Sequence, residues 1–150
     1  MKTFKEFLNE LFDNPEFYKE TKEGEFTFII AGKTYKCYFE FPRGNSYAEI
    51  SFGLMEIEDP EENDIPEFKW KISDSGGNEI KIFSTVITII KDYLRKHPEI
   101  DTIEFSSDLD EPSRVKLYDT MSKKLSNNIG FTLTRTYEKR NAKFYVLEMN

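Results

Sequence analysis

Residues 80–97, IKIFSTVITIIKDYLRKH, constrain the fold of this chain most. Apolar side chains recur there at helical spacing over a stretch too long for a strand, which predicts a buried helix ended by Pro98. Strand-like runs flank it at 68–73 and 100–107. A strand–helix–strand crossover over 68–106 predicts at least one parallel pair of strands. The apolar face of this helix is made by Ile82, Phe83, Val86, Ile87, Ile89, Ile90, Tyr93 and Leu94.

The other elements expected from the sequence are strands and one more helix. Alternating apolar residues on both sides of Ala31-Gly32 predict a hairpin, and a second hairpin is expected around residues 138–141. A helix over 108–128 has one apolar stripe, closed by Gly130. The expected strands are 24–30, 33–41, 46–57, 68–73, 100–107, 131–137 and 142–149. The fold class expected is therefore α+β, with a mixed, mainly antiparallel sheet and helices packed on it.

Length and charge limit the function classes. A chain of 150 residues predicts one compact domain, over 24–150, with 14 Phe and 8 Tyr to build its core. The net charge of −7 argues against a nucleic-acid binder. The locally basic stretch from Arg114 to Lys143 leaves two readings open, a solvated face and a nucleic-acid-associated role. No apolar run approaches the roughly 20 residues that a membrane span needs.

The chain holds few residues for metal or nucleophilic chemistry. Cys37 is the only cysteine and lies in a strand-like run, so we expect a buried thiol. With His97 as the only histidine, a Ser-His-Asp or Cys-His arrangement has little material. The acidic stretch 56–67 lacks calcium-loop spacing and is expected to be a solvated loop, so no metal site is predicted.

The order of elements from the fourth strand onward resembles the GNAT acetyltransferase fold. In that family a strand leads into a glycine-rich turn of the pattern Q/R-x-x-G-x-G/A. The following helix then offers its first amides to the pyrophosphate of coenzyme A. Here the turn is Ser73-Asp74-Ser75-Gly76-Gly77-Asn78, in which Gly76 matches the first glycine, while Ser73 and Asn78 depart from the pattern. The resemblance implies Ser75, Gly76, Gly77 and Asn78 as cofactor-binding residues in an acetyl-CoA-dependent enzyme. Because Asp74 brings a negative charge, we expect a degenerate loop and no cofactor.

The same resemblance implies catalytic residues for that alternative. Leu117-Tyr118 is similar to the family's L-Y-x-x-x-G-F pattern, whose tyrosine protonates the departing thiolate, although Gly130-Phe131 comes too late for that spacing. Glu104 or Asp108, near the end of the preceding strand, would then be the general base. The competing interpretation makes Tyr118 a core residue and Asp108 a helix cap.

The stretch MKTFKEFLNELF at residues 1–12 carries one apolar stripe, and Thr3 and Glu6 form a capping box. Its first ten residues resemble the capsid-targeting leader of internal head proteins from T-even-type phages, M-K-T-[YF]-x-E-F-[IL]-x-E. The prohead protease of those phages cuts after a glutamate that follows Leu or Ile by two residues. Leu8-Asn9-Glu10 fits this rule, which implies cleavage between Glu10 and Leu11.

Together these resemblances predict the organisation and role of the chain. Residues 1–12 are expected to be an amphipathic leader, 13–23 a polar tether and 24–150 a GNAT-like domain. The leader implies phage head or scaffold components as partners, a location in the head interior and then the host cytoplasm, and a host protein as a further partner. The function expected is a phage accessory protein that acts by binding. The alternative is a coenzyme A-dependent N-acetyltransferase of the GNAT type.

Overall fold

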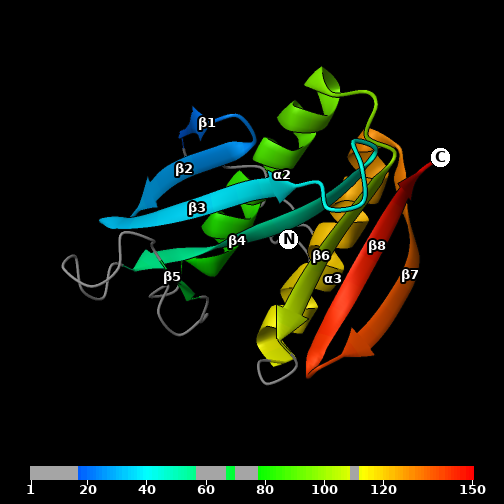
Figure 1. Cartoon of the computed structure of the whole chain (residues 1–150). Coiled ribbons are helices and arrows are strands. Elements are labelled where there is room, and N and C mark those ends of the chain that lie inside the picture. Colours follow the sequence, from blue (N-terminus) through cyan, green and yellow to red (C-terminus); the bar gives the residue numbers. More distant parts are fainter. Residues whose placement is uncertain (1–16, 57–66, 70–77, 109–111) are drawn as a thin grey trace, which may run out of the picture. The chain divides into compact units, whose positions relative to one another are not determined.

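The structure, a computed structural model, describes residues 17–56, 67–69, 78–108 and 112–150 (Figure 1). The expected leader helix, its processing residues Leu8, Asn9, Glu10 and Leu11, and the loop residues Ser75, Gly76 and Gly77 lie outside these ranges. Asn78, Glu104 and Tyr118 lie inside them.

The described residues form two helices and eight strands. The helices are α2 (Glu79–Lys96) and α3 (Pro112–Ile129). The strands are β1 (Tyr18–Lys22), β2 (Glu25–Ile30), β3 (Lys33–Glu40), β4 (Tyr47–Glu56), β5 (Glu67–Lys69), β6 (Thr102–Asp108), β7 (Phe131–Lys139) and β8 (Ala142–Met149). Neither described helix has the length and hydropathy to cross a membrane.

The sheet is mixed, which confirms the α+β class. Its hydrogen-bonded order is β1-β2-β3-β4-β6-β8-β7, and β5 pairs with β4. The predicted hairpins are present as antiparallel β2–β3 and β7–β8. A parallel pair is also present, but its first strand was predicted wrongly. The parallel neighbour of β6 is β4, whereas β5, at the start of the expected 68–73 strand, pairs antiparallel with β4.

Contacts divide the described residues into two compact units. The first unit holds the residues up to Tyr38 and those between Phe52 and Val86. Its core includes Phe28 stacked on Tyr35 at 5.6 Å and Phe52 meeting the edge of Phe83 at 5.4 Å. Cys37 is fully buried there, and burial raises the pKa of its thiol, so it is the inert core cysteine that the sequence predicts.

Strand β1 belongs to the first unit and falls inside the stretch expected to be a tether, 13–23. Tyr18, Lys19, Glu20 and Lys22 pair antiparallel with β2, with an irregularity between Glu20 and Lys22. Four of its five side chains are exposed. The sequence pattern does not indicate this strand, because an edge strand with exposed side chains needs no apolar alternation. For residues 18–22, the structure therefore differs from the expected tether.

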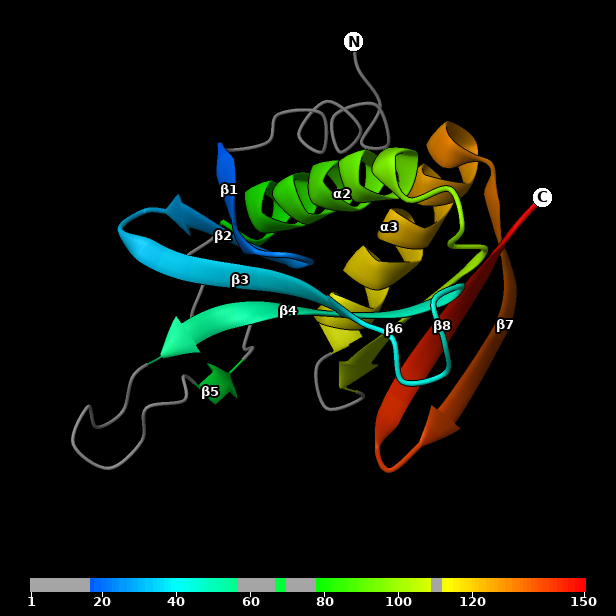
Figure 2. The same cartoon turned by 45° about the horizontal axis from the view of Figure 1, so that its top comes forward.

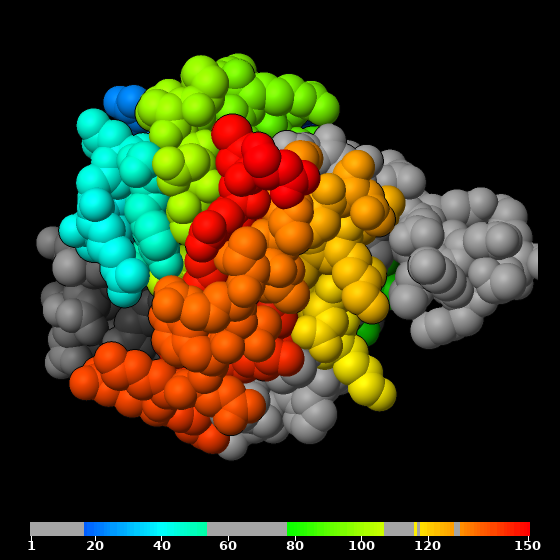
Figure 3. Space-filling model, turned by 90° about the vertical axis from the view of Figure 1, so that its right-hand side faces the viewer, coloured from blue at the N-terminus to red at the C-terminus, as the bar shows by residue number. Residues whose placement is uncertain are grey.

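The second unit holds residues 39–51 and 87–150. Here β6, β8 and β7 lie side by side, with α3 packed on one face of them (Figure 2). The sequence predicts a stripe of Val115, Tyr118, Met121 and Leu125 on α3; the last three are buried, and the Val115 side chain is not among those described. In Figure 3, β7 (orange), the end of β8 (red) and α3 (yellow to orange) are visible on the surface of this unit. Strand β7 is its edge, exposed over residues 132–136 and bulged between Leu133 and Arg135.

Gly130 links α3 to β7 with a left-handed backbone, at φ 72°. A Cβ built there meets nothing within 4 Å, and the carbonyl of Gly130 accepts the Asn150 amide at 2.9 Å. We therefore expect Gly130→Ala to cost about 1 kcal/mol through backbone conformation alone. Urea unfolding of the full chain measures this loss. Gly130→Asn, which tolerates positive φ better, should lose less, and equal losses for both variants would contradict the conformational cause.

Candidate functional site

Glu104 is the charged residue around which the polar contacts of the second unit gather. It lies in the middle of β6, and its side chain is only 6% exposed. Two tyrosine hydroxyls donate to the same carboxylate oxygen, Oε1: that of Tyr47 from β4 at 3.1 Å and that of Tyr137 from β7 at 2.6 Å. A carboxylate out of water needs such donors, since burial of an unpaired charge is costly.

The strand register explains why these side chains meet. Side chains alternate between the faces of a sheet, so Phe105 points to the face covered by α3 and Glu104 to the opposite one. Glu49 is the parallel register partner of Glu104. The pKa of Glu49 is raised by burial first and then by the charge of Glu104, with a smaller contribution from a side-chain hydrogen bond between the two carboxyl groups.

Aromatic rings and two arginines complete this cluster. The Arg43 guanidinium lies 5.0 Å from the ring centre of Tyr47, and that of Arg135 lies 5.1 Å from the ring of Tyr137. The Tyr137 ring also stacks on Phe144 at 4.8 Å. Hydrogen bonding to Glu104 and burial raise the pKa of Tyr137 to about 12. Burial and the Glu104 charge raise the pKa of Tyr47 as well.

We name the set Glu49, Glu104, Tyr47, Tyr137, Arg43 and Arg135 the carboxyl–tyrosine cluster. Glu104 was a candidate from the sequence, but its tyrosine partners were not. They stand 57 and 33 residues away along the chain, so only the register of the sheet reveals them. The one local signal is a glutamate between Ile103 and Phe105, which marks a polar face on a buried strand.

Tyr118 lies on the other side of β6, away from this cluster. It is 3% exposed and stacks on Phe105 at 5.4 Å and on Tyr145 at 5.8 Å. The structure therefore does not bring the two candidate catalytic residues into one polar site. Tyr118 takes the position that the core interpretation predicts, while its catalytic role stays an untested prediction.

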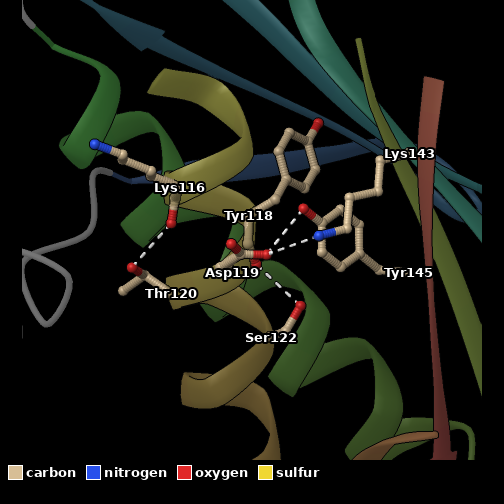
Figure 4. A network of polar contacts seen from close by, with 7 residues as sticks. All are labelled: Lys116, Tyr118, Asp119, Thr120, Ser122, Lys143 and Tyr145. Atoms are coloured by element: carbon tan, nitrogen blue, oxygen red, sulfur yellow. Dashed lines mark hydrogen bonds and ion pairs between the residues drawn. The ribbon is translucent and has the colours of Figure 1, made fainter. Parts of the chain in front are cut away.

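A second polar network joins α3 to β8 beside this aromatic stack (Figure 4). The Tyr145 hydroxyl donates to Oδ1 of Asp119 at 3.0 Å, and Nζ of Lys143 lies 3.7 Å from the same oxygen. Lys143 also lies 5.0 Å from the ring centre of Tyr145. Burial, followed by the bond to Asp119, raises the pKa of Tyr145. These contacts hold the helix against the sheet.

The start of α2 is where the GNAT resemblance implies the pyrophosphate of coenzyme A. Of the four implied residues the structure describes Asn78, whose carbonyl accepts the Ile82 amide at 3.0 Å. Glu79 follows in the first turn, where its carboxylate complements the helix dipole and repels an anion. Residues 57–78 also separate α2 from β4, the parallel partner of β6, so no short turn joins them. The described residues here do not fit a pyrophosphate.

A metal ion also lacks a described ligand set. Within the ranges that the structure covers, no three His, Cys, Asp or Glu side chains converge to hold a metal ion. Glu49 and Glu104 supply two carboxyl groups, and the groups that act on them are Glu40, Arg43, Tyr47 and Tyr137.

Comparisons with known proteins give similarities of structure only. No protein-family model and no curated protein sequence matches the chain. A GNAT-family acetyltransferase from Bacillus anthracis is similar to the chain with a TM-score of 0.47 and 12% identity, over 83% of this chain and 66% of that one. Aminoglycoside acetyltransferase AAC(6')-Ib in complex with coenzyme A gives 0.45 and 12%, over 83% and 65%. N-acetyltransferase PseH from Campylobacter jejuni gives 0.42 and 10%, over 86% and 71%. The chain thus spans just under two thirds of the length of the first two.

Proposed function

We propose that this chain is an accessory protein of a T-even-type phage, packaged in the head through residues 1–12 and delivered with the DNA. The observation that carries the proposal is the ten-residue match MKTFKEFLNE, which includes the processing signal Leu8-Asn9-Glu10. The partners of this segment are head or scaffold components. Its locations are the head interior and afterwards the host cytoplasm, where a host protein is the target.

The proposed mode of action is binding without a cofactor. Two observations support it. Oε1 of Glu104 already accepts two tyrosine hydroxyls, which lowers its availability as a general base. Glu79 sets a carboxylate at the helix start where the pyrophosphate of coenzyme A would have to bind.

Intact-mass analysis of purified particles tests the packaging. We expect a species that begins at Leu11, because cleavage after Glu10 removes the leader inside the head. Glu10→Gln should give particles that contain the full-length chain, since packaging is kept and the cleavage site is lost. The matched variant Glu16→Gln, which lies outside the ten-residue leader, should still be cut after Glu10. Particles without any form of the chain would remove the support for this function.

The alternative function is a coenzyme A-dependent N-acetyltransferase. Parallel strands β4 and β6, with α2 between them in the sequence, favour this scaffold, and Tyr118 and Glu104 would be its catalytic residues. Calorimetry with acetyl-CoA on the full chain separates the two functions, with a coenzyme A-binding acetyltransferase as positive control. We expect no heat of binding. Saturable heat that a substitution at Asn78 abolishes would favour the enzyme.

A further inference from the structure

The parallel pairing between β4 and β6, which we call the β4–β6 junction, is short and ends at two acidic residues. The Ser46 carbonyl accepts the amides of Asp101 and Thr102 at 2.9 and 3.1 Å, and parallel pairing then runs from Tyr47 to Glu49. The last register pair is Glu49 with Glu104. Beyond it, β6 continues in register with β8 as far as Asp108. A repulsion between the last two side chains would therefore act where the pairing of the two strands stops.

The two carboxyl groups cannot both ionise without cost. Neighbouring strands lie about 5 Å apart, and the Glu104 side chain is nearly excluded from water, so like charges are poorly screened. A single proton between them turns this repulsion into a hydrogen bond from the Glu49 carboxyl to the Glu104 carboxylate. Tyr47 and Tyr137 both donate to Oε1 of Glu104, so the shared proton is expected on Glu49, whose pKa is raised.

The surrounding charges leave this preference in place. Arg43 lowers the pKa of Glu49, whereas Glu40 on β3 raises it. On β8, the register partner of Glu104 is the apolar Val146. The titratable and charged groups around the pair are Glu40 from β3, Arg43 from the segment before β4, Tyr47 from β4, and Arg135 and Tyr137 from β7.

We propose that Glu49 and Glu104 form a one-proton carboxyl pair that stabilises the β4–β6 junction at acidic pH. This stabilisation is lost as the pH rises. The pair is a pH-sensitive contact within the second unit, independent of the leader and of any cofactor. Its sign follows from proton linkage. The folded state holds the Glu49 proton more tightly than the unfolded chain does. The stabilisation is therefore complete below the ordinary glutamate value of 4.5 and is lost as the pH rises through the elevated pKa of Glu49.

Glu49→Gln tests the proposal in the full chain. The glutamine side chain is isosteric, keeps a donor toward Glu104 and has no charge to gain, so it fixes the protonated arrangement. From about pH 4.5 to about pH 8, the urea midpoint of the wild-type chain should fall relative to that of the variant. Hydrogen exchange at the amides of Ala48 and Glu104, corrected for intrinsic rates, should lose protection with rising pH in the wild type alone. Glu148→Gln, an exposed change on β8, should behave as the wild type.

A direct titration keeps the test decisive if Glu49→Gln fails to fold. Carboxyl carbon shifts of the wild-type chain should give a titration midpoint for Glu49 above its ordinary value of 4.5. A Glu49 midpoint at or below that value would overturn the proposal. So would pH profiles of the wild type and of Glu49→Gln that run parallel.

Discussion

Replacing Phe105 with alanine should cost about 3–5 kcal/mol of unfolding free energy, the range for a buried aromatic residue truncated to alanine. Phe105 is 2% exposed, and its ring stacks on Tyr118 at 5.4 Å and on Tyr145 at 5.3 Å. Tyr118 and Tyr145 also stack on each other at 5.8 Å, so the three rings form one closed set. Its removal leaves a cavity beneath α3 that the two remaining rings cannot fill without leaving their own contacts.

Urea unfolding followed by circular dichroism measures this loss. The midpoint should fall while the slope stays constant, and domains of this size hold only about 5–15 kcal/mol in total. Leu133→Ala is the matched control, because Leu133 is 37% exposed on the edge strand β7 and its truncation should cost under about 1 kcal/mol. A loss below about 1 kcal/mol for Phe105→Ala would show that the stack does not support the second unit.

Patterns within one element predicted that element well. The apolar face of α2 was read from the spacing of its residues, and Ile82, Val86 and Ile90 are fully buried, as are others on that face. Helical periodicity is local, so 18 residues contain all the information that it needs. The two hairpins follow for the same reason, since Ala31-Gly32 and Arg140-Asn141 take the positive φ values that tight turns require.

Pairing between distant strands could not be predicted in this way. The crossover rule correctly required a parallel pair, but it chose the strand nearest to α2 along the chain. In the structure, β6 pairs parallel with β4, and β5 pairs antiparallel with β4. Alternation of apolar residues describes the faces of a strand and not its neighbours, so the choice between β4 and β5 depends on packing that no local pattern records.

The candidate site shows the same limit. Glu104 could be selected from the sequence because a charged residue in an apolar strand must have polar partners if it is buried. The hydrogen-bond partners of Glu104 could not be predicted, because Tyr47 and Tyr137 come from the distant strands β4 and β7. Tyr118 was selected from a family pattern, and the same residue fits the stripe of α3, which packs it against Phe105. Residue type therefore identified Glu104, whereas the strand register determines which side chains surround it.

The second large effect is expected at the hydroxyl of Tyr137. Tyr137→Phe removes the 2.6 Å hydrogen bond to Glu104 and keeps the ring that stacks on Phe144. Hydrogen bonds to charged groups contribute about 1.5–3 kcal/mol, and we expect a loss near the lower end because Tyr137 is only partly buried. Tyr47→Phe removes the longer bond of 3.1 Å to the same oxygen and should cost less. The double variant should lose more than the two single losses together, since Oε1 of Glu104 then keeps neither donor.

Alkaline titration gives a readout that a purely structural loss would not move. The bond to Glu104 raises the pKa of Tyr137 to about 12, so this tyrosine should ionise late in near-UV absorbance. Because the folded pKa is raised, the stability that the hydroxyl contributes is present below the ordinary value of 10.0 and is lost as the pH rises through about 12. Tyr137→Phe should delete one late-titrating group, while Tyr38→Phe, which leaves Glu104 and both of its donors unchanged, should not shift the Tyr137 step. If Tyr137→Phe instead removes a group that ionises near the ordinary value of 10.0, and leaves the urea midpoint unchanged, then Glu104 does not depend on this hydroxyl.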